Sequence, residues 1–351
     1  MKNGKIGWGI IGPGIIANMF AECLGLLDDA YIAAAGSRNI KRAEDFCERW
    51  GGKAYGSYDE VYNDPDVDIV YIAVPHPQHV DQVKAAAAAG KAILCEKPFS
   101  PNYASTESMI QAARDNNVFL MEGLWSRFFP AWQYASQLAQ SGELGKIRYI
   151  RSVTEWGCKR PGEADPTEDS KAGGALRDDN RLMDPNLAGG MLLDGGVYGV
   201  AAMTVASGLL EMPEKMITQM QFTHTGVDAR TSVMLKYRNG MTAELCCDLY
   251  GLEFGTLIEC EKGNIYVPRH RDPDTVIVER ALNGRYGVMD REEKYFPFES
   301  YGFQFEAAVV QDCFRQGLKE CPQVTHKEML LYAQLCGEIR KRHGFSYPFE
   351  K

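Results

Sequence analysis

Short apolar runs alternate with longer amphipathic stretches over the first third of the chain. The expected strands are apolar at nearly every position, as strands covered by helices on both faces must be, and they span residues 6–11, 31–35, 69–74, 92–95 and 118–121. Stretches with helical periodicity fill the gaps, at 15–26, 41–50, 79–89 and 103–116. Because each parallel strand needs a crossover helix before the next, this alternation predicts a doubly wound parallel sheet, the Rossmann fold.

The pattern changes after Trp125. A helix is expected at 131–141 and a strand at 147–156, followed by a polar stretch at 157–188 that we interpret as a long functional loop or lid. Strand-like runs then recur at 231–237, 242–249, 256–260 and 265–267. Turn signals such as Arg238-Asn239-Gly240 between them are typical of antiparallel hairpins. Two closing helices, at 303–317 and 326–342, are expected to pack against this second sheet.

A chain of 351 residues is long enough for two hydrophobic cores. We therefore expect an α/β Rossmann domain over 1–124 and an α+β domain over 125–351 with a large, mostly antiparallel open sheet. A net charge of −9 argues against a nucleic-acid partner, which needs a basic surface. The apolar stretch at 189–210 is interrupted by Asp194, so no membrane span is expected. Ten cysteines without ligand-like spacing indicate reduced thiols in the cytoplasm and no metal site.

A glycine-rich motif, Gly12-Pro13-Gly14-Ile15-Ile16-Ala17, directly follows the first expected strand and opens the first helix. In this context Gly12 permits a tight turn, and Gly14 lets backbone N–H groups approach a pyrophosphate at the positive end of the helix dipole. A glycine-rich turn without a ligand is the alternative, and the strand–helix–strand order argues against it. The motif predicts dinucleotide binding, with Gly12, Pro13, Gly14, Ile15 and Ile16 as cofactor residues.

The end of the second strand bears on the choice of cofactor. An NAD site usually has an acidic residue there to bind the ribose hydroxyls, whereas this chain reads Ala35-Gly36-Ser37-Arg38. Ser37, Arg38 and Arg42, one helical turn on, offer charge-assisted hydrogen bonds to a 2′-phosphate. A solvated arginine pair at a helix start is the alternative. We predict NADP, with NAD possible.

The next strand ends near Ala73, and we expect Ala73, Pro75 and His79 to line the cofactor, because ligands bind at the carboxyl edge of such sheets. A metal site formed by His76 and His79 is disfavoured, since no third ligand is close in sequence. His79 is instead expected to cap the following helix.

The motif Cys95-Glu96-Lys97-Pro98 ends the following strand and brings Glu96 and Lys97 to the same edge of the sheet. Taken alone, these two side chains are also compatible with a simple surface ion pair.

A second glycine-rich segment, Gly189-Gly190-Met191-Leu192-Leu193-Asp194-Gly195-Gly196-Val197-Tyr198, places Asp194 and Tyr198 four residues apart. If the segment is helical, their side chains share one face, and a carboxylate and a phenol can meet one substrate. A buried Tyr–Asp hydrogen bond that stabilises the helix is the alternative, but the glycines favour close approach of another group.

Together with Trp125-Ser126-Arg127-Phe128, these motifs resemble the Gfo/Idh/MocA oxidoreductase family over essentially the whole chain. Many polyol dehydrogenases of the family have histidine at the position of Tyr198. The tyrosine therefore resembles the branch that includes dimeric dihydrodiol dehydrogenase, D-xylose dehydrogenase and glucose-fructose oxidoreductase. The resemblance implies that Lys97 and Tyr198 are catalytic, that Asp194 orients the substrate, that Trp125 and Arg127 adjoin the cofactor, and that the second sheet supports a homodimer or higher oligomer.

The sequence thus predicts a hydride transfer between NADP and a secondary alcohol or hemiacetal carbon of a sugar or cyclic diol. Tyr198 would accept the hydroxyl proton, and Lys97 would stabilise the phenolate. Contacts to a sugar or diol are expected from Lys97, Asp194 and Tyr198. Further contacts are expected from side chains in and next to the polar stretch, namely Trp156, Arg177, Asn180 and Arg181. These four side chains are equally compatible with the surface of a lid. Alternatives are an NAD-dependent inositol or polyol dehydrogenase of the same family and a non-catalytic nucleotide-binding regulator.

Overall fold

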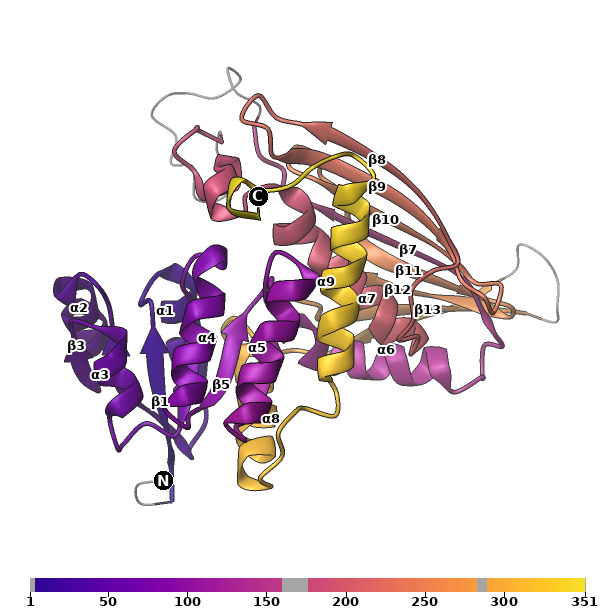
Figure 1. The fold of residues 1–351 in the computed structure, drawn as a ribbon. Coiled ribbons are helices and arrows are strands. Elements are labelled where there is room, and N and C mark those ends of the chain that lie inside the picture. Colours follow the sequence, from indigo (N-terminus) through magenta and orange to yellow (C-terminus); the bar gives the residue numbers. More distant parts are fainter. Residues whose placement is uncertain (1–3, 160–175, 283–288, 351) are drawn as a thin grey trace. The chain divides into compact units, whose positions relative to one another are not determined.

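The computed structural model describes residues 4–159, 176–282 and 289–350. The chain forms two compact units, each built from two segments (Figure 1). The first unit comprises Met1–Trp125 and Phe298–Ala333, and the second comprises Ser126–Pro297 and Gln334–Lys351. Each unit has its own sheet, so each is described by itself.

The first unit contains a six-stranded parallel sheet in the order β3-β2-β1-β4-β5-β6. The strands are β1 Ile6–Ile11, β2 Ala30–Gly36, β3 Lys53–Tyr55, β4 Ile69–Ile72, β5 Ala92–Glu96 and β6 Leu120–Gly123. The strand order reverses at β1 and β4, which creates the crevice where such sheets bind ligands at their carboxyl ends. The predicted doubly wound fold is confirmed. Strand β3 was not predicted, because its three residues are only half-buried or exposed and give no apolar run.

Helices cover both faces of this sheet: α1 Ile15–Leu24, α2 Ile40–Trp50, α3 Tyr58–Asn63, α4 His79–Ala88, α5 Tyr103–Asp115 and α8 Phe303–Arg315. In the core, Phe20 of α1 stacks on Tyr71 with ring centroids 3.9 Å apart. Phe303 of α8 packs edge-on against Phe20, at 6.1 Å, and stacks on Trp125, at 4.6 Å. The prediction that both closing helices pack against the second sheet is therefore wrong for α8, whose apolar face completes the first core instead.

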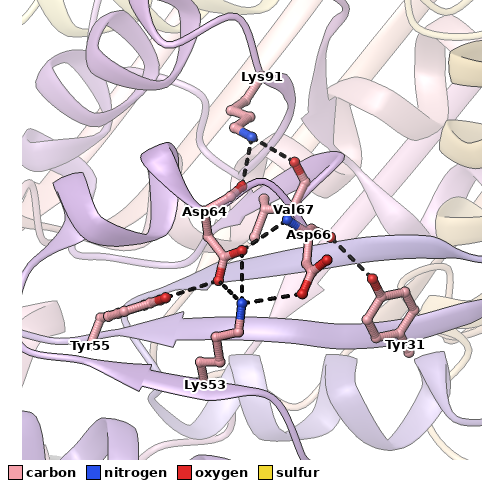
Figure 2. Close-up of polar contacts among 7 residues, drawn as sticks. All are labelled: Tyr31, Lys53, Tyr55, Asp64, Asp66, Val67 and Lys91. Carbon is pink, nitrogen blue, oxygen red and sulfur yellow. Dashed lines mark hydrogen bonds and ion pairs between the residues drawn. The ribbon is translucent and has the colours of Figure 1, made fainter. Parts of the chain in front are cut away.

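A polar network fastens the turn before β4 to the sheet edge (Figure 2). The Lys53 ammonium lies 3.0 Å from Asp64 Oδ2 and 3.2 Å from Asp66 Oδ2. The Tyr55 hydroxyl also donates to Asp64, at 3.0 Å, and the Lys91 ammonium donates to the Asp64 carbonyl oxygen, at 2.9 Å. Burial opposes the charge of Asp64, but the Asp66 amide, the Lys53 ammonium and the Tyr55 hydroxyl lower its pKa below the usual value.

The second unit contains an eight-stranded sheet in the order β14-β13-β12-β11-β7-β10-β9-β8, antiparallel except for the β7–β10 pair. Its strands are β7 Ile147–Glu155, β8 Lys215–Phe222, β9 Asp228–Lys236, β10 Thr242–Asp248, β11 Phe254–Cys260, β12 Gly263–Pro268, β13 Thr275–Ala281 and β14 Met289–Tyr295. The predicted large, mostly antiparallel sheet is confirmed. Strand β8 was not predicted, because most of its side chains are exposed and its sequence shows little alternation of apolar and polar residues.

Two helices, α6 Pro130–Gln140 and α7 Val197–Ser207, pack on this sheet, and α9 His326–Lys341 belongs to both units (Figure 1). Along β9 the exposed side chains, such as Arg230 and Met234, alternate with buried ones, so the sheet keeps one open face. The stretch Pro185–Ser207 is long and apolar enough to cross a membrane, but 94% of its apolar window is buried inside the protein. Its hydrophobicity therefore contributes to the core of the second unit.

Candidate active site

The glycine-rich turn lies between β1 and α1 in the first unit. Gly12 has a positive φ of 82°, and a Cβ there would lie 2.9 Å from Val74 Cγ1 and 3.1 Å from the Ala73 carbonyl oxygen. A Cβ on Gly14, by contrast, would find no atom nearer than 3.9 Å. Open space at Gly14, directly before the unpaired amides of the first helical turn, is the geometry that a bound phosphate group requires.

The side chains around this turn are arranged as helix–sheet packing demands. Ala17 is fully buried, whereas Ile15 and Ile16 are 64% and 42% exposed although they are large and apolar. Asn18 ties the turn to α2, because its amide donates to the Gly14 carbonyl oxygen at 2.8 Å and its oxygen accepts from the Trp50 indole at 2.8 Å. The residues at this edge therefore fit a dinucleotide.

The end of β2 carries no carboxylate. Ser37 is buried, and its hydroxyl oxygen accepts a hydrogen bond from the Asn39 amide at 3.2 Å, while Arg38 and Arg42 are exposed. A surface cavity of about 610 Å³ begins at the glycine-rich turn and extends along α1 and α2. Its lining includes Pro13, Gly14 and Ile15 together with Arg42 and two residues that the sequence did not single out, Arg49 and Tyr301.

His79 has a different place from the one expected. Its ring is fully buried, with Nε2 2.9 Å from the Val74 carbonyl oxygen and Nδ1 3.1 Å and 3.2 Å from those of Pro98 and Phe99. It caps no helix amide, so the prediction of a capping role is wrong. Burial lowers its pKa, and the ring links the loops that follow β4 and β5. Pro75 precedes the short helix His76–Gln78 in the same edge.

Glu96 and Lys97 follow β5 as predicted. Glu96 is buried and accepts hydrogen bonds from the Tyr71 hydroxyl at 2.5 Å and from the Lys97 amide at 3.1 Å. Glu96 is therefore held by the following amide and by Tyr71 of β4, and its burial does not fit a simple surface ion pair. Trp125, in the same unit, is buried against Phe303.

In the second unit, Asp194 and Tyr198 lie where a π-helical turn, Leu192–Gly196, passes into α7. Asp194 is 3% exposed, and both of its oxygens have partners: Oδ2 accepts from the Trp156 indole at 3.0 Å, and Oδ1 pairs with Arg181 at 2.8 Å. The Trp156 and Tyr198 rings meet edge to face at 6.4 Å. The structure therefore gathers Asp194, Tyr198, Trp156 and Arg181 into one cluster. Single π-helical turns often mark functional sites.

Glycines make this packing possible. A Cβ on Gly196 would lie 3.1 Å from Cys247 Sγ, and one on Gly199 would lie 2.4 Å from Leu245 Cδ1. The π-helical turn and α7 thus press directly on β10.

Two further residues extend the cluster. Phe254 stacks on Trp156 with centroids 6.0 Å apart, and the Arg271 guanidinium lies 5.3 Å from the Trp156 ring and 5.7 Å from that of Phe254. These contacts combine ring stacking with cation–π attraction. Neither residue could be identified from the sequence, since an aromatic residue at a strand start and an arginine in a turn carry no signal until the strands pair.

Two other expected substrate residues of this unit, Arg177 and Asn180, make local contacts. Arg177 is exposed and pairs with Asp179 at 3.4 Å, while the Asn180 side chain accepts from the Leu182 amide and so begins the short helix Arg181–Met183. In the second unit the Arg127 carbonyl oxygen accepts from the Gln133 amide. Residues 160–175 of the expected lid lie outside the described part of the chain. Among the described residues, no group of three or more His, Cys, Asp or Glu side chains could hold a metal.

Comparisons with known proteins agree with this architecture. Residues 6–124 match an oxidoreductase family with an NAD-binding Rossmann fold, GFO_IDH_MocA, and residues 132–265 match the GFO/IDH/MocA C-terminal domain. Trans-1,2-dihydrobenzene-1,2-diol dehydrogenase of Mus musculus is 36% identical over 98% of both chains.

Solved structures with the same fold include a 3-ketoreductase of Actinomadura kijaniata in complex with NADP, with a TM-score of 0.77 and 22% identity over 96% of this chain and 97% of that one. An aldose-aldose oxidoreductase of Caulobacter crescentus, complexed with glycerol, has a TM-score of 0.79 and 25% identity over 97% and 98% of the two chains.

Proposed function

Since the chain belongs to the Gfo/Idh/MocA family of NAD(P)-dependent oxidoreductases, we propose that it moves a hydride between NADP and a secondary alcohol carbon of a cyclic diol or sugar. The observation that carries this proposal is the cluster in the second unit: a buried carboxylate, Asp194, held between Trp156 and Arg181 beside the phenol of Tyr198. A carboxylate, a phenol and aromatic faces together are what binding and deprotonating a ring alcohol requires.

The proposed substrate is a flat or puckered ring with neighbouring hydroxyl groups. Relatives across 98% of the chain are named for a cyclic diol, trans-1,2-dihydrobenzene-1,2-diol. The stacked rings of Trp156 and Phe254, with Arg271 over them, offer an apolar surface to such a ring. The Asp194 carboxylate, held by the Trp156 indole and Arg181, is the group proposed to accept a hydrogen bond from a ring hydroxyl. A sugar hemiacetal is the second candidate, because one structural relative is named an aldose-aldose oxidoreductase.

In the proposed chemistry a bound nicotinamide supplies the hydride acceptor, and the protein moves the proton. Tyr198 accepts the proton of the substrate hydroxyl, while Asp194 orients that hydroxyl through a hydrogen bond. Lys97 stabilises the phenolate by its positive charge. In the reverse direction Tyr198 donates the proton to the carbonyl oxygen.

The acid–base role is tested with Tyr198→Phe, which should lower kcat by about two to four powers of ten while NADP binding persists. Tyr237→Phe removes another buried phenol of the second unit and serves as the matched control. If Lys97 and Tyr198 act on the same substrate, the loss in the Lys97→Met/Tyr198→Phe double variant should be far smaller than the product of the single losses. Near-normal turnover of Tyr198→Phe would reject the assignment.

For the cofactor we propose NADP, bound through the glycine-rich turn and through Ser37, Arg38 and Arg42, with Ala73, Pro75, Glu96, Trp125 and Arg127 contributing nearby. The absence of an acid at the end of β2 and the exposure of both arginines support a 2′-phosphate there. His79 would contribute indirectly, because its buried ring holds the loop that begins at Pro75 through the Val74 carbonyl oxygen.

The remaining proposals concern substrate contacts, organisation and assembly. We propose that Lys97, Arg177 and Asn180 join the cluster around Asp194 when the substrate binds. We also propose that residues 1–124 form the cofactor-binding domain and 125–351 the substrate-binding and oligomerisation domain of a cytoplasmic homo-oligomer, although Phe298–Ala333, with α8, packs in the first unit. The open face of the second sheet, with Ile217 and Met234 72% and 61% exposed, supports the oligomer. This proposal is tested by measuring the molar mass of Met234→Lys and of the unchanged protein by light scattering. A lysine buried in the interface should convert the oligomer to monomers.

A panel of alcohols, with absorbance at 340 nm reporting NADPH, separates the substrate candidates. The panel contains trans-1,2-dihydrobenzene-1,2-diol, D-xylose, D-glucose and an inositol. The proposal predicts the highest kcat/KM for a diol or an aldose with NADP. Exclusive turnover of the inositol with NAD would contradict it.

A further inference from the structure

A buried carboxylate, that of Asp228, contacts the Gly189–Gly190 turn, which leads into the segment that contains Asp194. Asp228, the first residue of β9, is fully buried, and its Oδ2 accepts hydrogen bonds from the Leu192 amide at 2.7 Å and from the Thr231 hydroxyl at 3.1 Å. Leu192 is the first residue of the π-helical turn that contains Asp194. Asp228 thus binds an amide at the start of this turn, where a negative charge is favoured by the helix dipole.

The same carboxylate explains why residue 190 is glycine. A Cβ on Gly190 would lie 2.2 Å from Asp228 Oδ1, and the residue has a positive φ of 104°. The backbone of the turn therefore lies directly on the carboxylate. Asp228 Oδ1 itself is buried without a hydrogen-bond partner among the described residues. Burial raises the pKa of Asp228 to about 6, despite the opposing hydrogen bonds and the positive charge of Arg340.

The C-terminal tail contacts the neighbouring residue of the same turn. After α9 the chain folds back so that Pro348–Glu350 lies beside Pro185–Leu187 (Figure 1). The Tyr347 side chain is fully buried, and its hydroxyl donates to the Gly189 carbonyl oxygen at 2.8 Å.

The tail is fixed in this position by Arg340. The guanidinium makes two hydrogen bonds with Glu350, at 2.6 and 3.0 Å, and lies 4.8 Å from the Tyr347 ring. Both charged side chains are almost fully buried, at 4% and 11% exposure. The Glu350 carboxylate also accepts from the Tyr347 amide at 2.8 Å, so the tail is tied at both ends of its last turn.

We propose that Asp228 and Tyr347 are positioning residues that together hold the Gly189–Gly190 turn. Through this turn they keep the Asp194 and Tyr198 side chains in the positions that the proposed reaction requires. This inference rests on the proposed function, because it takes Asp194 and Tyr198 as the groups that meet the substrate. Both contacts end on one short segment: Tyr347 binds the Gly189 carbonyl oxygen, and Asp228 binds the Leu192 amide. The C-terminal tail, although distant in sequence from Asp194 and Tyr198, thereby helps to position these two side chains in the second unit.

The test compares Tyr347→Phe and Asp228→Ala with the unchanged protein, using trans-1,2-dihydrobenzene-1,2-diol and D-xylose as probes. Misplacement of a catalytic group by about 1 Å costs up to about a hundredfold, so we expect kcat to fall about tenfold or more while KM for NADP stays within about twofold. Asp228→Asn keeps an oxygen for the Leu192 amide and should restore most of the kcat lost in Asp228→Ala.

Matched controls remove the same groups from the first unit. Tyr62→Phe deletes a buried phenol that donates to Gln82 at 2.8 Å, and Asp64→Asn changes the buried carboxylate of Figure 2. Both should lower the melting temperature and leave kcat unchanged. If Tyr347→Phe and Asp228→Ala behave like these controls, losing stability but not kcat, the inference is overturned.

Hydrogen–deuterium exchange decides the inference independently of turnover. Residues 189–196 should exchange at least tenfold faster in Tyr347→Phe and Asp228→Ala, while β10 keeps its protection. If the unchanged protein oxidises neither probe, the proposed function fails, and exchange still decides whether these residues hold the turn. Unchanged protection of residues 189–196 would overturn the inference even in an active enzyme.

Discussion

Replacing Asp228 with Asn should change how the stability of the protein depends on pH. Burial raises the pKa of Asp228 from its usual 3.8 to about 6. A group whose folded pKa is raised stabilises the protein at low pH, and that contribution is lost as pH rises through the folded pKa. A shift of about two pKa units corresponds to about 3 kcal/mol.

Urea unfolding at a series of pH values between 2 and 8 measures this effect. The unfolding free energy of the unchanged protein should fall, relative to that of Asp228→Asn, by about 3 kcal/mol across this window. Asp64→Asn provides a control of opposite sign: the pKa of Asp64 is lowered, so the unchanged protein should gain stability over this variant as pH rises from low values. The reasoning would be refuted if the difference in unfolding free energy between Asp228→Asn and the unchanged protein stayed constant with pH. It would also be refuted if the unchanged protein became more stable relative to the variant as pH rises.

Three further predictions use other parts of the chain. Gly190→Ala should lower the melting temperature by many degrees, because the added Cβ would lie 2.2 Å from an Asp228 oxygen, and differential scanning calorimetry would show it. Arg38→Ala should raise KM for NADP at least tenfold more than KM for NAD in initial-rate assays; equal changes would exclude a contact with the 2′-phosphate. Trp156→Phe keeps a ring but removes the indole donor to Asp194, so kcat/KM for the diol should fall about tenfold, and an unchanged value would separate Trp156 from the site.

The sequence determined the elements whose signals are local. The helices α1 and α2 begin within a residue of their predicted starts, and β1 has its predicted bounds, because each carries its own periodicity or glycine-rich boundary. The glycine-rich turn was predicted for the same reason, since Gly12 must adopt a positive φ whatever lies elsewhere in the chain. Strands β8 and β14 carry little or no apolar alternation, so they were found only in the structure.

The candidate site was predictable only in part. Asp194 and Tyr198 were proposed from their spacing in a segment expected to be helical; the segment is a π-helical turn that passes into α7, and Gly195 and Gly196 pack closely on Met191 and Cys247. Phe254 was not found, since its role depends on strand pairing.

Tertiary structure alone decided which distant segments meet. Helix α8 resembles any amphipathic helix in sequence, yet Phe303 fits against Trp125 and Phe20, so it joins the first core rather than the second sheet. Likewise, nothing local distinguishes Asp228 or Tyr347 from an ordinary strand start or a terminal aromatic residue. Their importance comes from burial against the Gly189–Gly190 turn, and burial is a property of the packed fold, because the free energy of a polar contact depends on the water that other segments exclude.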